Sequence, residues 1–414
     1  MISASTSESA FAIDGSNGPF AVVAERLLNF ALFITILASS FVFVEPSPHD
    51  ALIFILLLTC VTAHVGFDRK LVPLLLLLLL WLIGGSLSLI QVGNEEKAIQ
   101  YLGTSFYLSV AAITFACLFS EGNAVRLAIM RRAYILAAVV ATATGYVGFF
   151  HLLPGSDVFL ANERVSATFK DPNVYGPFLI YPMLLISMEL VTRGLRVSSL
   201  AALAFLLSGL FLSFSRGAWA NFAVSLTICF VIMLAMTRDP RMRGRIALLG
   251  VGAVVAAALL VIALMSIDSV YQLFLDRAKA IQPYDIGPGG RFSLQQLALN
   301  AILDHPNGMG PFEFARVFGL QQHNVYLQGF LVYGWLGGAA YMTIVAVTLV
   351  LGLTAVRVTA PWQNYLVAAF AAFVGEVCEG LIVDTDHWRH FFLLLGLIWG
   401  LTAATINYQR QFRS

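Results

Sequence analysis

Long apolar stretches separated by short polar breaks make up most of the chain. Each stretch approaches the roughly 20 mostly apolar residues that an α-helix needs to cross a lipid bilayer. They lie at residues 26–44, 50–66, 71–90, 101–119, 133–153, 174–191, 197–213, 217–236, 246–267, 325–355, 362–383 and 388–406. This pattern predicts an all-α membrane protein with about 12 transmembrane helices.

One polar insertion, residues 268–322, is far longer than the other breaks. Its segment Arg291 to Asp304 (RFSLQQLALNAILD) repeats apolar residues at helical spacing, which predicts an amphipathic helix lying at the membrane surface. Glycines and a proline at 287–290 precede this helix, and the turn HPNG at 305–308 would end it. Because long loops in compact proteins are usually functional or disordered, we expect this ordered one to roof a cavity.

These features divide the chain into five expected regions. They are a disordered cytoplasmic tail (1–25), a first transmembrane region (26–267), a catalytic loop (268–322), a C-terminal transmembrane region (323–406) and a second cytoplasmic tail (407–414). The first tail is Ser-rich without a basic start, so it does not resemble a signal peptide.

The composition supports a membrane location. Hydrophobic residues make up 59% of the chain and charged residues 11%, whereas soluble domains carry about 25% charged residues. The net charge of +1 gives the chain no general attraction to nucleic acid. Nucleic acid is therefore not expected as a partner. The four cysteines all fall in apolar stretches without metal or redox spacing, which predicts buried, inert thiols at Cys60, Cys117, Cys229 and Cys378.

The positive charges predict an orientation, because Lys and Arg accumulate in short cytoplasmic loops. With both ends inside, most of the 24 Lys and Arg fall on the cytoplasmic side. The others would face the periplasm: Lys97, Arg164, Lys170, Arg216, Arg277, Lys279, Arg291, Arg316 and Arg389. Anionic ligand binding would explain cations on that side, and ordinary loop solvation is the alternative.

His323 is a candidate general base, because it ends the long loop and is followed at the start of an apolar span by Asn324, a candidate substrate contact. A histidine titrates near neutral pH and can take a proton from an attacking hydroxyl if its neighbours hold it in place. Taken alone, a single histidine at a helix start is more often structural or simply exposed.

Arg216 and Arg291 are candidate phosphate ligands. Arg216 lies in the polar break SFSRG between two apolar spans, and its forked donors match phosphate oxygens in two-point contact. Arg291 opens the predicted helix, whose N-terminal dipole also attracts anions. A snorkelling or ion-paired arginine is the alternative for Arg216, and a solvated loop charge is the alternative for Arg291.

Two further polar clusters are weaker candidates. In RVSATFKDPN, Arg164 and Lys170 could hold donor or acceptor groups, while Asn173 is expected to cap the next helix. In DTDHWRH, residues 384–390, His387 and Arg389 could contact substrate.

Four carboxylates keep open roles. An Asp-x-Asp pair, Asp384 and Asp386, could hold a divalent ion against a sugar nucleotide, but such nucleotides are cytoplasmic and this pair is expected outside. Metal binding is therefore a minor alternative. Glu376 and Glu379 share a helical face and are expected to pair structurally, with Arg216 or Arg389 as partners.

The stretch GGRFSLQQLALNAILDHPNGMGPFEF followed by HNVYLQGFLVYGWLGG resembles the O-antigen ligase and polymerase superfamily. RVSATFKDPNVYG and LSFSRGAW are similar to earlier segments of that superfamily, in the same order. The resemblance covers residues 164–338. The DTDHWRH stretch departs from the family pattern, which leaves the roles of its residues open.

The resemblance implies a multi-pass glycosyltransferase of the bacterial inner membrane that acts at the periplasmic face without nucleotide, metal or other cofactor. Its donor would be a glycan on undecaprenyl pyrophosphate, and its acceptor a lipid A core or another lipid-linked glycan, both presented among membrane lipids. The family's two essential arginines match Arg216 and Arg291, and its loop histidine matches His323. The resemblance also implies inversion at the anomeric carbon.

Ligase and polymerase activities, including exopolysaccharide polymerisation, both fit these residues. A transporter or flippase is the rival from another class, although transporters usually place binding groups near mid-membrane and repeat their halves. A non-catalytic scaffold for envelope assembly is a third alternative.

Overall fold

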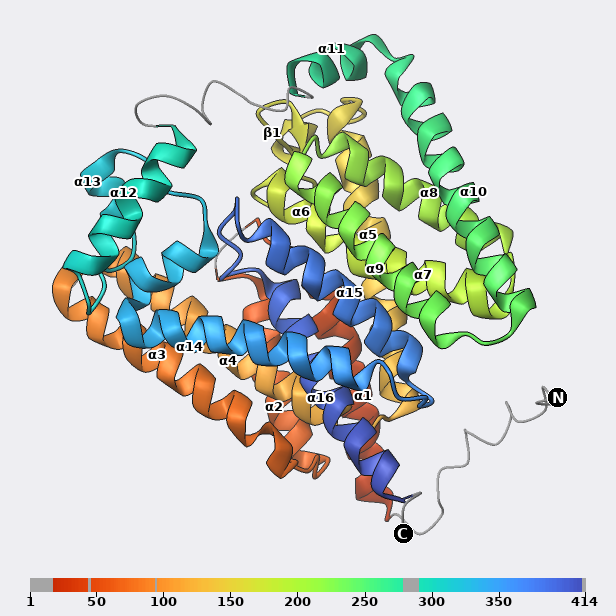
Figure 1. Ribbon diagram of the computed structural model, residues 1–414, viewed down its shortest axis with the longest axis horizontal. Coiled ribbons are helices and arrows are strands. Elements are labelled where there is room, and N and C mark those ends of the chain that lie inside the picture. Colours follow the sequence, from red (N-terminus) through yellow and green to blue (C-terminus); the bar gives the residue numbers. More distant parts are fainter. Residues whose placement is uncertain (1–17, 44–45, 94, 278–289, 412–414) are drawn as a thin grey trace.

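The computed structural model describes residues 18–43, 46–93, 95–277 and 290–411, and these residues are almost entirely helical (Figure 1). The first half contains α1 (Pro19–Ala38), α2 (Pro48–Thr62), η2 (Arg69–Leu71), α3 (Val72–Val92), α4 (Glu96–Phe119), α5 (Ala124–Phe149), η3 (Ser156–Phe159), α6 (Pro172–Phe178), α7 (Ile180–Arg193) and α8 (Val197–Leu212). The second half contains α9 (Arg216–Met236), α10 (Pro240–Met265), α11 (Asp268–Arg277), α12 (Arg291–Asp304), α13 (Glu313–Phe318), α14 (Val325–Ala355), α15 (Gln363–Glu379) and α16 (Arg389–Gln411). A short antiparallel hairpin joins β1 (Leu160–Ala161) to β2 (Arg164–Val165).

The all-α prediction is confirmed, but the expected number of spans is not reached. Within the described ranges, eight helical segments are long and apolar enough to cross a membrane. The two shorter apolar helices α2 and α8 have 15 and 16 residues, and α15 has 17. These lengths fall below the roughly 20 residues on which the sequence-based count relied. Moreover, α1 begins at Pro19, inside the segment expected to be a disordered tail.

Small residues let neighbouring helices approach closely. A Cβ at Gly84 of α3 would lie 2.5 Å from the amide nitrogen of Gly337 in α14, and one at Gly396 of α16 would lie 2.4 Å from the carbonyl oxygen of Ala112 in α4. Without a hydrophobic drive between helices in lipid, such close van der Waals packing is what holds them together. The α3/α14 and α4/α16 pairs are therefore closely packed, and α3 lies beside α14 along one edge of the bundle (Figure 1).

The burial of the cysteines departs in part from the prediction. Cys60 and Cys229 are buried, Cys117 is partly buried and Cys378 is exposed. An apolar stretch indicates a helix but not which face of it meets the rest of the protein.

The long insertion is ordered where it is described. The predicted amphipathic helix is present as α12 with the expected ends, Arg291 and Asp304. Its buried residues Leu294 and Ala298 belong to a small apolar cluster with Leu331 of α14. This packing holds α12 against the bundle, with α13 beside it (Figure 1).

The turn after α12 fits into a break in α14. Gly334 has φ +65° and ψ −175°, so the helix is interrupted there. The amide of Trp335 donates to the carbonyl of Pro306 at 2.8 Å, and the amide of Met309 donates to the carbonyl of Leu331 at 2.7 Å. The turn thus supplies hydrogen-bond partners for the backbone groups of α14 that the break leaves unpaired. It brings together the HPNG turn and the GWLGG segment, both noted in the sequence.

We expect Gly334→Ala to lower the free energy of unfolding by about 1–3 kcal/mol. The alanine would be held in a strained backbone conformation, with its Cβ pressed against the neighbouring turn. That Cβ would lie 2.7 Å from the carbonyl carbon of Asn307, at a φ of +65°. Gly250→Ala in α10 is the control, since its Cβ meets nothing within 4 Å. Thermal midpoints of the two detergent-purified variants measure the effect, and equal midpoints would contradict it.

Candidate functional site

The start of α14 is fixed against the end of α15. The amide of Val325 donates to the carbonyl of Gly380 at 2.8 Å, and Nδ2 of Asn324 donates to the carbonyl of Leu381 at 3.1 Å. Oδ1 of Asn324 also caps α14 by accepting from the amides of Tyr326 and Leu327. Asn324, predicted to contact substrate, thus has its amide group engaged in holding the loop.

His323 precedes this cap and faces a carboxylate. Its backbone has φ +48°, a strained conformation for a residue with a Cβ. Nδ1 lies 3.6 Å from Oδ2 of Asp384, and 48% of the histidine side chain is exposed. A carboxylate beside Nδ1 favours the tautomer protonated there, which makes Nε2 the nitrogen that can accept a proton. Asp384 therefore gives His323 the oriented imidazole that a general base needs.

Arg216 is the first residue of α9, and a cluster of hydrogen bonds holds the turn before it. Arg164 donates from Nε to the carbonyl of Ser213 and from Nη2 to Oδ1 of Asn173, both at 2.9 Å. The hydroxyl of Ser215, the N-cap of α9, donates to the same Asn173 oxygen at 2.9 Å. Arg164 thus contacts the segment that carries Arg216, a role the sequence did not indicate.

The neighbouring cap differs from the prediction. Asp171, not Asn173, caps α6, because its Oδ1 accepts from the amide of Asn173 at 2.8 Å. Lys170 is exposed directly before this cap. Both residues lie on the segment that runs from β2 to α6.

The end of α15 connects Arg216 to His323. Nδ2 of Asn221 in α9 donates to Oε2 of buried Glu379 at 2.7 Å, and a Cβ at Gly217 would lie 2.7 Å from Oε1 of the same carboxylate. Glu379 is the last residue of α15 and precedes Gly380, which binds the start of α14. The first turn of α9 and the loop at His323 therefore meet the same end of α15.

The helix α12 reaches the same place. Nε2 of Gln295 lies 3.4 Å from the carbonyl oxygens of Gln322 and Leu381. Arg291 begins α12 about one turn earlier, and its side chain lies outside the described residues. Backbone segments of all three predicted catalytic residues are thus gathered at one end of the bundle.

The DTDHWRH stretch is mostly tied into the bundle. Arg389 donates from Nε and Nη2 to the two carboxylate oxygens of Asp50 at 3.0 and 3.1 Å, which joins α16 to α2. Nε2 of His387 lies 3.0 Å from the hydroxyl of Ser105 in α4, and its ring centroid lies 4.0 Å from that of Tyr101. His387 and Arg389, both predicted to contact substrate, therefore contact other parts of the protein. The sequence pattern identified neither Ser105 nor Asp50 as a partner.

The two glutamates contact a histidine and an asparagine, and their expected pairing with Arg216 or Arg389 stays a prediction. Oε1 of Glu376 lies 3.6 Å from Nε2 of His390, and Glu379 accepts from Asn221. The two aspartates also diverge, since Asp384 faces His323 while Asp386 accepts from the hydroxyl of Tyr101 at 2.6 Å. Within the described residues no group of three or more His, Cys, Asp or Glu side chains is arranged to hold a metal ion.

Burial shifts the ionisation of this loop. Burial and the nearby Asp384 carboxylate raise the pKa of Asp386 to about 7, against hydrogen bonds from Tyr101 and Tyr333 that lower it. Burial and the Arg389 cation lower the pKa of His387 to about 3. The loop that carries Asp384 therefore rests on a neutral imidazole and a carboxyl that titrates near neutral pH.

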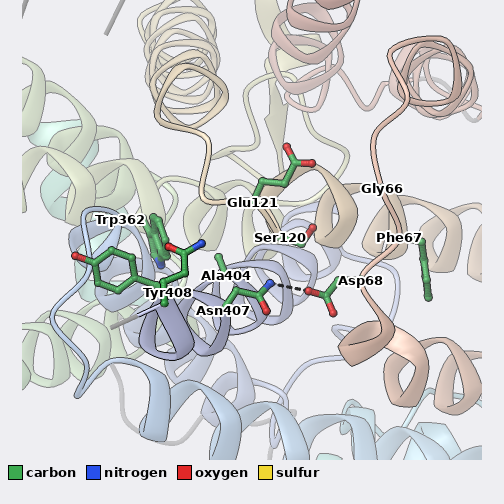
Figure 2. A pocket seen from close by; sticks show the side chains of 10 residues that line it. Gly66, Phe67, Asp68, Ser120, Glu121, Trp362, Ala404, Asn407 and Tyr408 are labelled. Carbon is green, nitrogen blue, oxygen red and sulfur yellow. Dashed lines mark hydrogen bonds between the residues drawn. The ribbon is translucent and has the colours of Figure 1, made fainter. Parts of the chain in front are cut away.

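A separate polar pocket of about 440 Å³ lies at the other end of the helices (Figure 2). Asp68, Glu121, Trp362 and Tyr408 line it, together with Asn407, which donates to Asp68 at 2.8 Å. None of the predicted site residues lines this pocket. It lies at the C-terminal end of α16, whereas Arg389 begins that helix near the candidate site.

Comparison with known proteins agrees with the resemblance seen in the sequence. A family model described as O-Antigen ligase matches residues 201–342, a span that contains Arg216, Arg291 and His323. No curated protein matches the chain. The protein is thus a multi-pass membrane protein in which residues 201–342 match the O-antigen ligase model.

The raised pKa of Asp386 makes stability depend on pH. Between the ordinary value of 3.8 and about 7, the folded protein holds a proton that the unfolded chain has released. The stability that protonated Asp386 contributes is therefore fully present at low pH and is lost as pH rises through this window. The free energy of unfolding falls there by at most about 1.4 kcal/mol per pH unit.

We expect the stability of the wild type relative to Asp386→Asn to fall from about pH 4 to pH 7. His387 is common to both proteins, so its opposite dependence cancels. Thermal midpoints of both proteins in detergent across this range measure the difference. A difference that stays constant or rises with pH would contradict the assignment.

Proposed function

We propose that this multi-pass membrane protein, whose residues 201–342 match the O-antigen ligase model, transfers a glycan from undecaprenyl pyrophosphate to an acceptor hydroxyl at the periplasmic face. The observation that carries the proposal is the pairing of His323 with Asp384 at the same end of α15 that meets the first turn of α9. This arrangement offers a base and a phosphate-binding cation to one substrate.

The proposed reaction uses His323 as the base. Nε2 takes the proton of the acceptor hydroxyl as that oxygen attacks the anomeric carbon, and Asp384 stabilises the imidazolium that results. The bond between the anomeric carbon and the pyrophosphate oxygen breaks on the opposite face. The product is therefore inverted at the anomeric centre, and the proton remains on His323 until it is released to solvent.

Arg216 neutralises the charge that develops on the leaving pyrophosphate, and Arg291 is proposed as its second ligand. The N-terminus of α9 adds its dipole at Arg216, which also favours an anion there. Charges fixed in advance contribute more to the transition state than mobile ones, because they need no reorganisation. In this proposal, binding of the pyrophosphate explains why Arg216 and Arg291 face the periplasm, although positive residues usually accumulate on the cytoplasmic side.

The acceptor distinguishes two forms of this proposal. A ligase uses a sugar hydroxyl of a lipid A core, and a polymerase uses another lipid-linked repeat. A glycolipid gel of cells that lack the gene separates them, because loss of polymer on the core differs visibly from loss of chain length.

We expect His323→Ala and Arg216→Ala each to reduce glycan transfer at least about 100-fold. His323 is half exposed, so its substitution should leave the amount of folded protein in the membrane unchanged. The matched control is His151→Ala, because His151 also pairs with an aspartate, Asp157, at 2.9 Å. Glycolipid gels of complemented cells measure transfer, and normal glycan attachment in either variant defeats the proposal.

Arg164 is proposed to position Arg216, and Arg164→Lys tests this role. A lysine cannot bridge Ser213 and Asn173 as the guanidinium does, so the start of α9 should shift. We expect the KM for the lipid-linked donor to rise about tenfold, as for the loss of roughly 1.4 kcal/mol of binding, with the KM for the acceptor unchanged.

Arg241→Lys, an exposed substitution in the first turn of α10, is the control for Arg164→Lys. Equal losses toward donor and acceptor, in proportion to the amount of folded protein, would show that Arg164 serves folding only.

A further inference from the structure

A cavity of about 410 Å³ lies between α12 and α13. The turn after α12 and Gln91 at the end of α3 also line it. Its position is fixed, because α12 packs on α14 and the amide of Met309 in the turn donates to the carbonyl of Leu331 at 2.7 Å. The cavity is thus part of the ordered fold.

One face of α12 lines the first wall. Leu297, Asn300, Ala301 and Asp304 follow the spacing of three, four and seven residues that places side chains on one side of a helix. Asn300 and Asp304 are one turn apart and both exposed, so an amide and a carboxylate face the same space. The adjoining face of α12, at Leu294 and Ala298, is buried, and Ala301 lies between the two faces.

The second wall combines an ion pair with an aromatic ring. Nε of Arg316 donates to the two oxygens of Glu313 at 3.0 and 2.9 Å. Phe318, the last residue of α13, adds an apolar surface. Planar polar groups on both walls beside an apolar ring suit a ligand with several hydroxyls and an apolar ring face.

The cavity lies on another face of α12 than Gln295, which does not line it and which faces the proposed catalytic site. Gln295 of α12 contacts the carbonyl of Gln322, the residue before His323. Among the described residues, the walls carry the carboxylates of Asp304 and Glu313, the cation of Arg316 and the ring of His305. This balance disfavours a diphosphate and favours an uncharged or amino sugar.

We propose that this cavity binds a sugar residue of the glycan, with Asn300 and Asp304 as its main hydrogen-bonding groups. The proposal rests on the transferase function, because a sugar bound on α12, the helix that also contacts the loop before His323, is then part of either the acceptor or the donor chain. Its place on α12 would set which sugar meets the base.

Binding to purified full-length protein in detergent tests the site without any transfer step. The probe is the lipid-free polysaccharide released by mild acid from the glycolipid of cells that produce the protein. We expect the Asn300→Ala/Asp304→Ala double variant to bind this probe at least about tenfold more weakly than the wild type. Gln296→Ala, an exposed substitution on α12 that does not line the cavity, should bind as the wild type does.

Two further measurements separate the alternatives. His323→Ala should bind the polysaccharide as the wild type does. Binding therefore tests the sugar site separately from the transferase proposal. Inorganic pyrophosphate should not displace the polysaccharide. In transfer assays the double variant should raise KM for either the acceptor or the donor, which assigns the sugar to one of them.

The proposal is overturned if the wild type does not bind the polysaccharide or if the double variant binds it equally well. Displacement by pyrophosphate would also overturn it, because the cavity would then be an anion site. Unchanged KM values for both substrates in the double variant would likewise exclude a sugar site.

Discussion

The structure depends on the contact between the start of α14 and the end of α15. Two hydrogen bonds, from Val325 to the carbonyl of Gly380 and from Asn324 to that of Leu381, hold segments that are distant along the chain. Because Gly380 follows the last residue of α15, this contact places His323 next to the loop that bears Asp384. Buried backbone groups that pair in this way cannot slip without losing partners. The orientation of the proposed base is therefore a consequence of how two helices end.

A second constraint is the membrane itself, which allows the bundle only close helix packing and satisfied polar groups. Accordingly, two nitrogens of the Arg389 guanidinium donate to the carboxylate of Asp50. The turn after α12 pairs with the backbone groups of α14 that the break at Gly334 leaves unpaired. The residues proposed for catalysis lie at the end where α9, α12 and α14 begin. Arg164 and Asn173 at the start of α9 extend this ordered surface.

The sequence predicted what depends on local pattern. Helical spacing gave α12 with its correct ends, and the family-like segments indicated Arg216 and His323, which lie within the matched domain. It missed partners that only the folded chain brings together, such as Asp384 for His323 and Asp50 for Arg389. The expected count of about 12 spans is not shown, because eight helical segments of the described residues meet the length and hydropathy of a full crossing. The helices α2, α8 and α15, with 15–17 residues, are shorter than the length rule requires.

The central claim is that His323 and α12 share one outward-facing end of the bundle, with the polar pocket of Figure 2 at the other end. Cysteine labelling tests it most directly, in a background where the four native cysteines are replaced. A membrane-impermeant maleimide applied to intact cells should label His323→Cys and Gln296→Cys, and should label Glu121→Cys only after lysis. Labelling of Glu121→Cys from outside, or protection of His323→Cys, would contradict the account.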